Sequence, residues 1–223
     1  MNYGLCLFDL DGTLTDSKSG IVNSIKYGLN ALGKAILDEG ILDLFLGPPL
    51  RDSFKIFCGC DDIEAEKAIA KYREYYATQG IFENFPYPGI ENLLKELRKN
   101  NIKLAVATSK PTYYAEKILA RFKLDCYFEL VAGSEMDGTR SDKAEIITYV
   151  LENLGTHKSV GVGVVMIGDR KHDIIGAKAC RIDSIGARWG YATGDELEKA
   201  GCTYFASSPE ELLNIILHKN NGV

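Results

Sequence analysis

Short, continuous apolar runs alternate along most of this chain with longer stretches in which apolar residues recur every three or four positions. The first run, residues 4–8, is typical of a strand that is covered on both faces. Further strands are predicted at 102–107, 128–132, 162–167, 183–187 and 203–206, with helices at 111–122, 142–154 and 172–180. Strands that alternate with helices in this way predict an α/β fold, a parallel sheet with helices on both faces.

One long segment departs from this alternation directly after the first strand. Apolar residues recur there at helical spacing over 21–32 and 61–78, with Asp61 as the expected N-cap of the second helix. A short helix is predicted from Leu50 to Phe57, after the Pro48-Pro49 break. We therefore expect an inserted all-helical cap domain at 16–85, within an α/β core formed by 1–15 and 86–223.

Polar side chains follow the apolar strands at the points where these strands end. Ligands of open parallel sheets bind outside the carboxyl ends of the strands, so these residues are expected to share one site. The set contains four acids, two hydroxyl residues and one lysine: Asp9, Asp11, Thr108, Ser109, Lys143, Asp169 and Asp173.

Each of these residues, taken alone, has an ordinary structural role to play. Asp11-Gly12 is a common turn sequence, Thr108 is a possible helix cap, and a single lysine such as Lys143 is usually solvated. The combination at successive strand ends is more specific. It favours a site for Mg²⁺ and phosphate in which an aspartate is the nucleophile.

The same segments resemble the four motifs of haloacid dehalogenase-like (HAD) phosphohydrolases. Asp9-Leu10-Asp11-Gly12-Thr13 is similar to the first motif, and Thr108-Ser109-Lys110 to the second. Lys143 corresponds to the third motif, and Gly168-Asp169-Arg170-Lys171-His172-Asp173 to the fourth. The resemblance covers essentially the whole chain and implies a Rossmann-like core with a helical cap.

Two further segments resemble the phosphoglycolate-phosphatase-like branch of this family. They are Gly47-Pro48-Pro49-Leu50-Arg51-Asp52 in the helical insertion and Trp189-Gly190-Tyr191 near the end of the chain. Arg51 is a candidate substrate-binding residue, because a guanidinium suits a substrate carboxylate or a second phosphate. We interpret Trp189 as a packing residue.

The resemblance implies specific roles for the residues at the strand ends. Asp9 would attack phosphorus and form an aspartyl phosphate, and Asp11 would act as the general acid and then as the general base. Mg²⁺ would be bound by Asp9, Asp11 (through its backbone carbonyl), Asp169 and Asp173, the last directly or through water. The phosphoryl oxygens would be held by Thr108, Ser109 and Lys143. His172 is a hypothetical contributor at the metal edge.

The net charge and the cysteine pattern limit the classes of partner and the cellular compartment that we expect for this protein. The 223 residues carry a net charge of −5 and no basic run, which argues against a nucleic acid polymer or a membrane surface as the main partner. The six cysteines follow no disulfide or metal-binding spacing, and the amino terminus lacks a signal-peptide pattern. We expect a cytoplasmic protein, a monomer or weak dimer, that binds a small phosphorylated metabolite.

The function that these features predict is Mg²⁺-dependent hydrolysis of a small phosphomonoester, as in phosphoglycolate phosphatases. The first alternative is a 5′-nucleotidase acting on nucleoside monophosphates. A sugar phosphomutase and a pyrophosphatase follow, and then a phosphate-binding regulator without turnover. A dehalogenase is disfavoured because Asp11 and Asp169 would have no obvious role in it.

Overall fold

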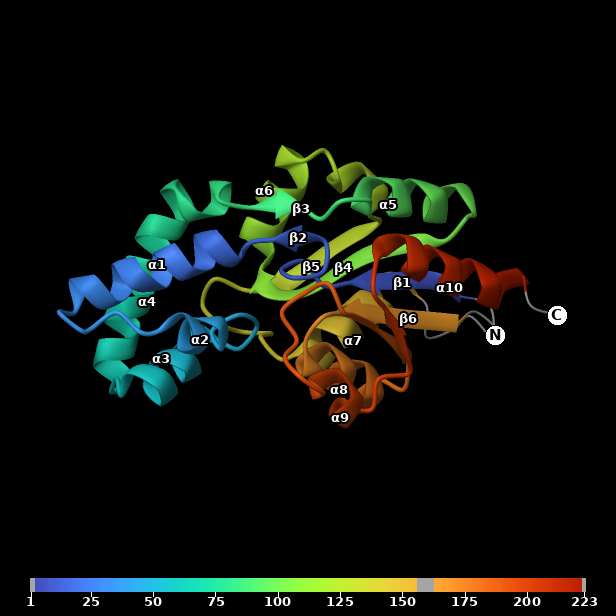
Figure 1. The fold of residues 1–223 in the computed structure, drawn as a ribbon. Coiled ribbons are helices and arrows are strands. Elements are labelled where there is room, and N and C mark those ends of the chain that lie inside the picture. Colours follow the sequence, from blue (N-terminus) through green and yellow to red (C-terminus); the bar gives the residue numbers. More distant parts are fainter. Residues whose placement is uncertain (1–2, 156–162, 222–223) are drawn as a thin grey trace. The chain divides into compact units, whose positions relative to one another are not determined.

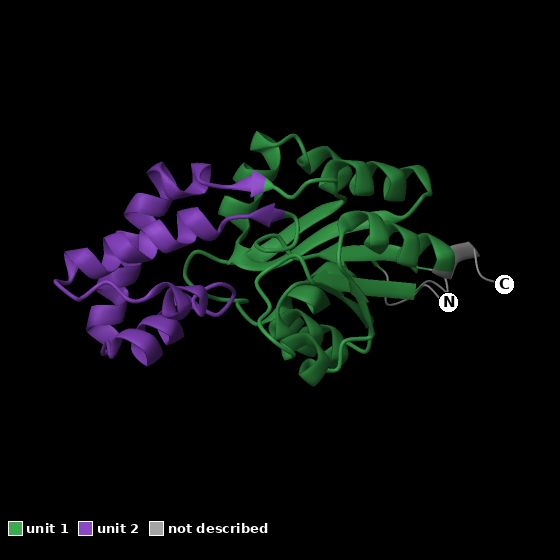
Figure 2. Cartoon of the chain, viewed as in Figure 1, with its two compact units in different colours: residues 1–14, 86–223 green, residues 15–85 purple. Residues whose placement is uncertain are grey.

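The computed structural model describes residues 3–155 and 163–221 (Figure 1). The chain forms two compact units (Figure 2): unit 1 comprises Met1–Leu14 and Pro86–Val223, and unit 2 comprises Thr15–Phe85. Unit 2 is thus inserted into unit 1 directly after the first strand. The expected division into a core of 1–15 and 86–223 and a helical cap of 16–85 stays a prediction.

Unit 1 is built on a six-stranded sheet in which every neighbouring pair is parallel. Its order is β5-β4-β1-β6-β7-β8, which is 3-2-1-4-5-6 when only these strands are counted along the chain. This is the Rossmann order, whose topological switch point lies between the first and fourth strands, here β1 and β6. The strands are β1 (Tyr3–Phe8), β4 (Lys103–Pro111), β5 (Leu130–Ser134), β6 (Gly163–Gly168), β7 (Asp183–Ala187) and β8 (Tyr204–Ala206).

Helices cover both faces of this sheet, which confirms the predicted Rossmann-like α/β fold (Figure 1). Helices α5, α6 and α10 pack on one face and α7 and α8 on the other. Leu5 and Leu7 of β1 are fully buried against Ile146 and Val150 of α7, which explains why the first strand is continuously apolar. The helices are α5 (Ile90–Lys99), α6 (Thr112–Arg121), α7 (Lys143–Asn153), α8 (Lys171–Ala179), α9 (Glu196–Ala200) and α10 (Pro209–Asn221), with a 3₁₀ turn at Asp125–Tyr127.

Unit 2 is helical, as its spacing of apolar residues predicts. It contains α1 (Lys18–Ala31), α2 (Glu39–Asp43), α3 (Leu50–Cys58), α4 (Asp62–Thr78) and a 3₁₀ turn at Gly80–Phe82. Asp61 caps α4 in a reciprocal capping box with Glu64, which confirms the expected start of that helix. Helix α2 is not predicted, because five residues are too few to establish a period. Where the chain enters unit 2 and returns, β2 (Thr15–Asp16) pairs with β3 (Phe85–Pro86).

One expected strand boundary is wrong in a way that affects the site. The strand predicted to end at 107 continues to Pro111, so Thr108, Ser109 and Lys110 belong to β4 instead of a loop after it. Polar contacts with β5 hold this segment extended: the Ser134 hydroxyl donates to the Ser109 carbonyl at 3.0 Å. Polar residues at a strand end give no apolar signal, which is why the sequence pattern stops short.

Strand β6 begins one residue after its predicted start, and position 162 lies outside the described residues. Among the helices of residues 3–155 and 163–221, none is both long enough and apolar enough to cross a lipid bilayer.

Candidate active site

Asp9 stands at the point where the chain leaves β1, beside the end of β6. Its backbone N–H donates to the carbonyl of Ile167 at 2.9 Å, which fixes the two strand ends together. Three residues later the chain turns at Gly12, with a φ of +80°, and a Cβ there would lie 2.2 Å from Asp169 Oδ2. Only glycine allows this turn so close to the second carboxylate.

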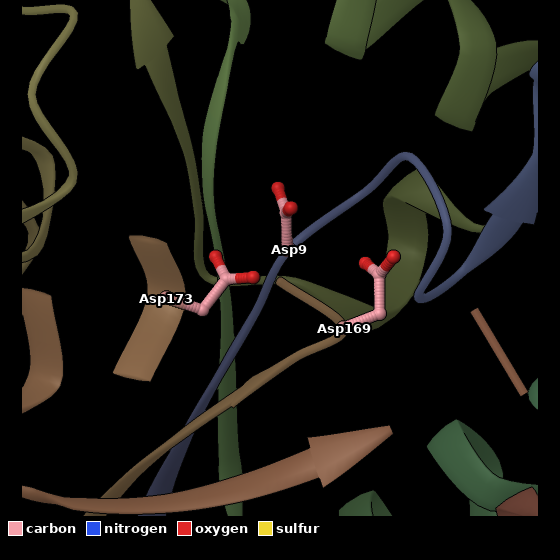
Figure 3. Close-up of side chains that lie close together, drawn as sticks. All are labelled: Asp9, Asp169 and Asp173. Carbon is pink, nitrogen blue, oxygen red and sulfur yellow. The ribbon is translucent and has the colours of Figure 1, made fainter. Parts of the chain in front are cut away.

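Three carboxylates gather at this switch point: those of Asp9, Asp169 and Asp173 (Figure 3). One oxygen from each lies within 4.8 Å of the others. Asp9 follows β1, Asp169 follows β6, and Asp173 lies in the first turn of α8. All three are buried, with Asp169 0% and Asp173 1% exposed. Buried carboxylates this close together are costly unless cations neutralise them.

Lys143 supplies one of these cations from the first residue of α7. Its Nζ lies 3.0 Å from Asp9 Oδ1 and 2.7 Å from Asp173 Oδ1, and it donates to the Ala107 carbonyl at 3.1 Å. Burial by itself lowers the pKa of Lys143, but the charges of Asp173 and Asp9 outweigh it and raise the pKa above its usual range. Lys143 therefore carries a positive charge and forms ion pairs with both Asp9, the candidate nucleophile, and Asp173 of the fourth motif.

Asp169 is held by hydrogen bonds at both oxygens. The Thr13 hydroxyl donates to Oδ1 at 2.9 Å, and the backbone N–H of Tyr191 donates to Oδ2 at 2.8 Å. Burial, followed by the charges of Asp173 and Asp9, nevertheless raises the pKa of Asp169 well above its ordinary value. The pKa of Asp173 is raised to about 6, mainly by burial. Burial is thus the main cause of both shifts, and the negative charges of the neighbouring aspartates add to it.

The second motif brings a second lysine to the site. Lys110 Nζ lies 2.6 Å from Asp11 Oδ2. The backbone N–H of Lys110 donates to the Thr108 hydroxyl oxygen at 3.3 Å, which leaves the Thr108 proton for another acceptor. Thr108 is buried and Ser109 half-buried, at the carboxyl end of β4. Of the predicted site residues, Asp9, Lys143, Asp169 and Asp173 thus lie together, and Asp11 forms an ion pair with Lys110.

The charges of the assembled site fit a divalent cation. The acid cluster (Asp9, Asp169 and Asp173) and the ammonium of Lys143 together carry a formal charge of −2, which one Mg²⁺ would neutralise. Arg170 does not change this balance, because its Nε donates to Glu196 at 2.9 Å. The donors at the acid cluster are all oxygens, as Mg²⁺ prefers. The residues present therefore suit Mg²⁺ better than a thiophilic metal.

The pKa of Asp173 predicts opposite effects of pH on stability and on metal binding. Unfolded aspartate titrates near pH 4 and folded Asp173 at about 6, so between these values the folded state binds the extra proton. Metal-free protein should therefore gain stability as pH falls from 7.5 to 5.5, whereas Mg²⁺ affinity should fall roughly three- to fivefold as protons compete.

Thermal unfolding in chelator and Mg²⁺ titration calorimetry, each at both pH values, measure the two effects. An Asp173→Asn variant removes this titrating group and should show a smaller pH dependence of both quantities, and the dependence that remains is assigned to Asp169, whose pKa is also raised. A wild-type Mg²⁺ affinity that is the same at the two pH values would contradict this account of Asp173.

The loop that follows β7 contacts Asp169 of the acid cluster and the backbone of Thr13. The sequence pattern does not predict these contacts. Trp189 Nε1 donates to the Thr13 carbonyl at 3.0 Å, and Tyr191 N–H binds Asp169. Gly190, between them, passes so close that a Cβ would lie 2.3 Å from both Asp169 Cβ and the Gly12 carbonyl oxygen. Trp189 is thus more than a packing residue. The only feature of the sequence that points to this loop is the resemblance of residues 189–191 to the phosphoglycolate-phosphatase-like branch.

We predict that Gly190→Ala disturbs this loop. The added methyl group has no room, so the variant should lose about 1–3 kcal/mol of stability, and Mg²⁺ should bind more weakly because Asp169 must shift. Gly40→Ala is the matched control, since nothing lies within 4 Å of its Cβ position. Unfolding curves and Mg²⁺ titrations check both. If Gly190→Ala behaves like the control, the close approach is not structurally important.

Two other sequence candidates have less direct support. Arg51 belongs to unit 2, where it is exposed and its guanidinium contacts Glu66 and Asp62 of α4. His172 is half-buried in the first turn of α8, and burial, with Lys171 and Arg170, lowers its pKa, so its imidazole is neutral at pH 7. Its suggested role at the metal edge stays a hypothesis.

Comparisons with known proteins agree with the geometry. The family described as haloacid dehalogenase-like hydrolase matches residues 6–187. A 5′-nucleotidase of Pseudomonas aeruginosa is 38% identical over 216 residues, covering 97% of this chain and 96% of its own. A phosphoglycolate phosphatase of Colwellia psychrerythraea is 29% identical over 93% of this chain and 94% of its own. The crystal structure of a predicted phosphatase from Clostridium acetobutylicum superimposes with a TM-score of 0.91, at 42% identity, over 98% of this chain and 100% of that one.

The family match over residues 6–187 includes the strand ends and the helix start that carry the acid cluster and Lys143. These three relatives are named as phosphatases or a nucleotidase. The chain therefore belongs to the haloacid dehalogenase-like hydrolase family, as a phosphatase of the phosphoglycolate-phosphatase-like branch.

Proposed function

We propose that this phosphatase hydrolyses small phosphomonoesters, that it requires Mg²⁺, and that Asp9 is its nucleophile. One observation carries the proposal: Asp9 shares a buried cluster with Asp169 and Asp173 and contacts the ammonium of Lys143. Phosphoryl transfer depends chiefly on positioning and charge neutralisation. An oriented carboxylate beside a metal-binding cluster and a fixed cation meets both requirements.

The reaction then has two displacements at phosphorus. A carboxylate oxygen of Asp9 attacks phosphorus, and the bond from phosphorus to the ester oxygen breaks as Asp11 donates its proton to that oxygen. Asp11 next removes a proton from water, which attacks phosphorus and breaks the bond to Asp9. Alcohol and inorganic phosphate leave, and both aspartates return to their starting states.

Asp9, Asp169, Asp173 and the Asp11 carbonyl are the groups that would hold Mg²⁺. The ion would offset the negative charge of the phosphoryl group that must approach the acid cluster. Thr13 and the N–H of Tyr191 orient Asp169 for this role, and the N–H of Arg170 orients Asp173 at 3.0 Å. Such supporting contacts fix ligand direction and tune affinity.

The remaining site residues would bind the phosphoryl oxygens. Lys143 would contribute its ammonium group and Thr108 its hydroxyl proton. Ser109 is included because it lies next to Thr108 near the carboxyl end of β4. Unit 2 would act as the cap that excludes water and selects the rest of the substrate. Arg51 is the residue of this cap proposed to bind a second anionic group, and in exchange it would have to give up Glu66 and Asp62.

Two classes of phosphomonoester are the leading substrates. Phosphoglycolate is favoured by the motif resemblance in the chain, and nucleoside monophosphates by the higher identity to the relative named 5′-nucleotidase. Both classes present a terminal phosphate to the same core chemistry. They differ in the part that unit 2 would contact, so only a direct comparison of rates can separate them.

The test is phosphate release from a panel of esters, with Mg²⁺ and with chelator. The panel contains phosphoglycolate, nucleoside monophosphates, sugar phosphates and pyrophosphate, and the highest kcat/KM identifies the substrate class. We expect release to require Mg²⁺. Conversion of a sugar phosphate to its isomer without free phosphate would indicate a mutase, and binding without any turnover a regulator. Either result would refute the proposed hydrolysis.

A further inference from the structure

The two lysines at the site contact different carboxylates. Lys143 contacts Asp9 and Asp173, on the side of the acid cluster, whereas Lys110 lies 2.6 Å from Asp11 Oδ2. The side chain of Lys110 is 5% exposed and that of Asp11 17% exposed. A charge pair so sheltered from water has a definite geometry, unlike a mobile pair on the surface.

The backbone of β4 fixes where Lys110 stands. Its N–H donates to the Thr108 hydroxyl oxygen, and the adjoining Ser109 carbonyl accepts from Ser134 of β5. The two Asp11 oxygens then differ. Oδ2 contacts the ammonium, whereas Oδ1 is buried and has no hydrogen-bond partner within the described part of the chain. One oxygen is held, and the other is left for a further partner.

We propose that Lys110 is a positioning residue for the acid and base function of Asp11, an inference that rests on the proposed function. Lys110 holds Oδ2, and Oδ1 is the oxygen that carries the proton. When Oδ1 gives its proton to the ester oxygen, the negative charge that develops on the Asp11 carboxylate lies beside the ammonium. Lys110 keeps its own protons throughout, so the proton passes only between Asp11 and the substrate, and later between water and Asp11.

This role predicts a selective defect. An alkyl phosphate expels a basic alkoxide that needs a proton, whereas acetyl phosphate expels acetate, which does not. The value of kcat/KM covers only the steps up to formation of the aspartyl phosphate, so it isolates the acid function of Asp11 from its later function as a base. Loss of Lys110 should therefore damage alkyl phosphate turnover and spare acetyl phosphate. A purely structural lysine, or one that binds phosphate, would affect both substrates equally.

The experiment compares Lys110→Met with wild type on acetyl phosphate and on the best alkyl ester of the panel. We expect kcat/KM for the alkyl ester to fall about a hundredfold, within the usual range of general acid catalysis, and that for acetyl phosphate to fall less than about threefold. Lys110→Arg should recover most of the alkyl activity. Lys99→Met is the matched control, since Lys99 is exposed on α5 and its ion pair is with Glu96, one turn earlier on the same helix.

A double-mutant cycle gives a second, independent readout. In an Asp11→Asn background, Lys110→Met should change kcat/KM for the alkyl ester by less than about twofold, because the group through which Lys110 acts is already gone. If Lys110→Met does not fold, as thermal unfolding will show, Lys110→Gln replaces it, with the same selective loss expected.

Equal losses on the two substrates, or full additivity with Asp11→Asn, would overturn the role of Lys110 and leave the proposed function intact. Absence of Mg²⁺-dependent phosphate release by the wild-type protein would instead refute the proposed function, and the inference with it.

Discussion

Asp9→Asn should reduce the turnover of every phosphate ester by at least about 10⁴-fold, the scale expected when a nucleophile is removed. The amide oxygen is a poor nucleophile, and the variant also loses one negative charge from the cluster with Asp169 and Asp173. Asp169 is not expected to replace it, because both of its oxygens accept hydrogen bonds, from Thr13 and from Tyr191. Phosphate release measured at saturating Mg²⁺ gives the size of the loss.

The folded structure should survive this change. Asparagine has nearly the same shape as aspartate, and removing one of three clustered carboxylates relieves repulsion when no metal is bound. In chelator, the melting temperature of Asp9→Asn should therefore equal or exceed that of wild type. Asp142→Asn is the matched control, since Asp142 caps α7 beside the site and asparagine caps equally well. Full activity in Asp9→Asn would refute the mechanism.

Lys143→Ala should cause the second largest loss, a fall in kcat/KM on the order of a hundredfold or more. The ammonium contacts Asp9 and Asp173 and is the proposed ligand of the phosphoryl oxygens, so its removal affects both charge balance and positioning. Stability should fall as well, by about 3–5 kcal/mol, because the change leaves buried carboxylates without their cation. Steady-state kinetics and denaturant unfolding measure the two effects.

The stability loss of Lys143→Ala should shrink when Mg²⁺ is added or when the pH is lowered towards 5.5. Metal binding neutralises the orphaned carboxylates, and a lower pH protonates them, Asp173 among them with its pKa raised to about 6. Lys178→Ala, on the exposed side of α8, is the control and should change neither quantity appreciably. If Lys143→Ala were as active as this control, the ammonium would have no role in catalysis.

Most of the fold can be predicted from this sequence because its strands are buried on both faces. In a chain of this composition, a short continuous apolar run such as the one in β1 is typical of a strand at the centre of a parallel sheet. Helices with strong signals at their ends, such as α4 with its Asp61 cap, can also be predicted nearly to the residue. Prediction failed where local signals are weak: at α2, which is too short, and at the polar end of β4.

The candidate site shows a similar division. The positions of Asp9, Asp169 and Asp173 could be expected together because they follow strands that meet at one edge of a parallel sheet. The contact between Lys110 and Asp11 could not, since it depends on how far β4 extends beyond its apolar run. The same holds for the loop at Gly190, which reaches Asp169 only through tertiary packing.

The proposed mechanism requires the phosphoryl group to pass through Asp9, and the resulting covalent intermediate can be trapped. The wild-type enzyme is mixed with Mg²⁺ and a ³²P-labelled ester, quenched in acid within milliseconds, digested, and its labelled peptide identified. We predict label on the peptide that contains Asp9, removable by hydroxylamine as expected of an acyl phosphate, and no label on Asp9→Asn. Label on a residue other than Asp9, or protein-bound label in Asp9→Asn, would contradict this mechanism.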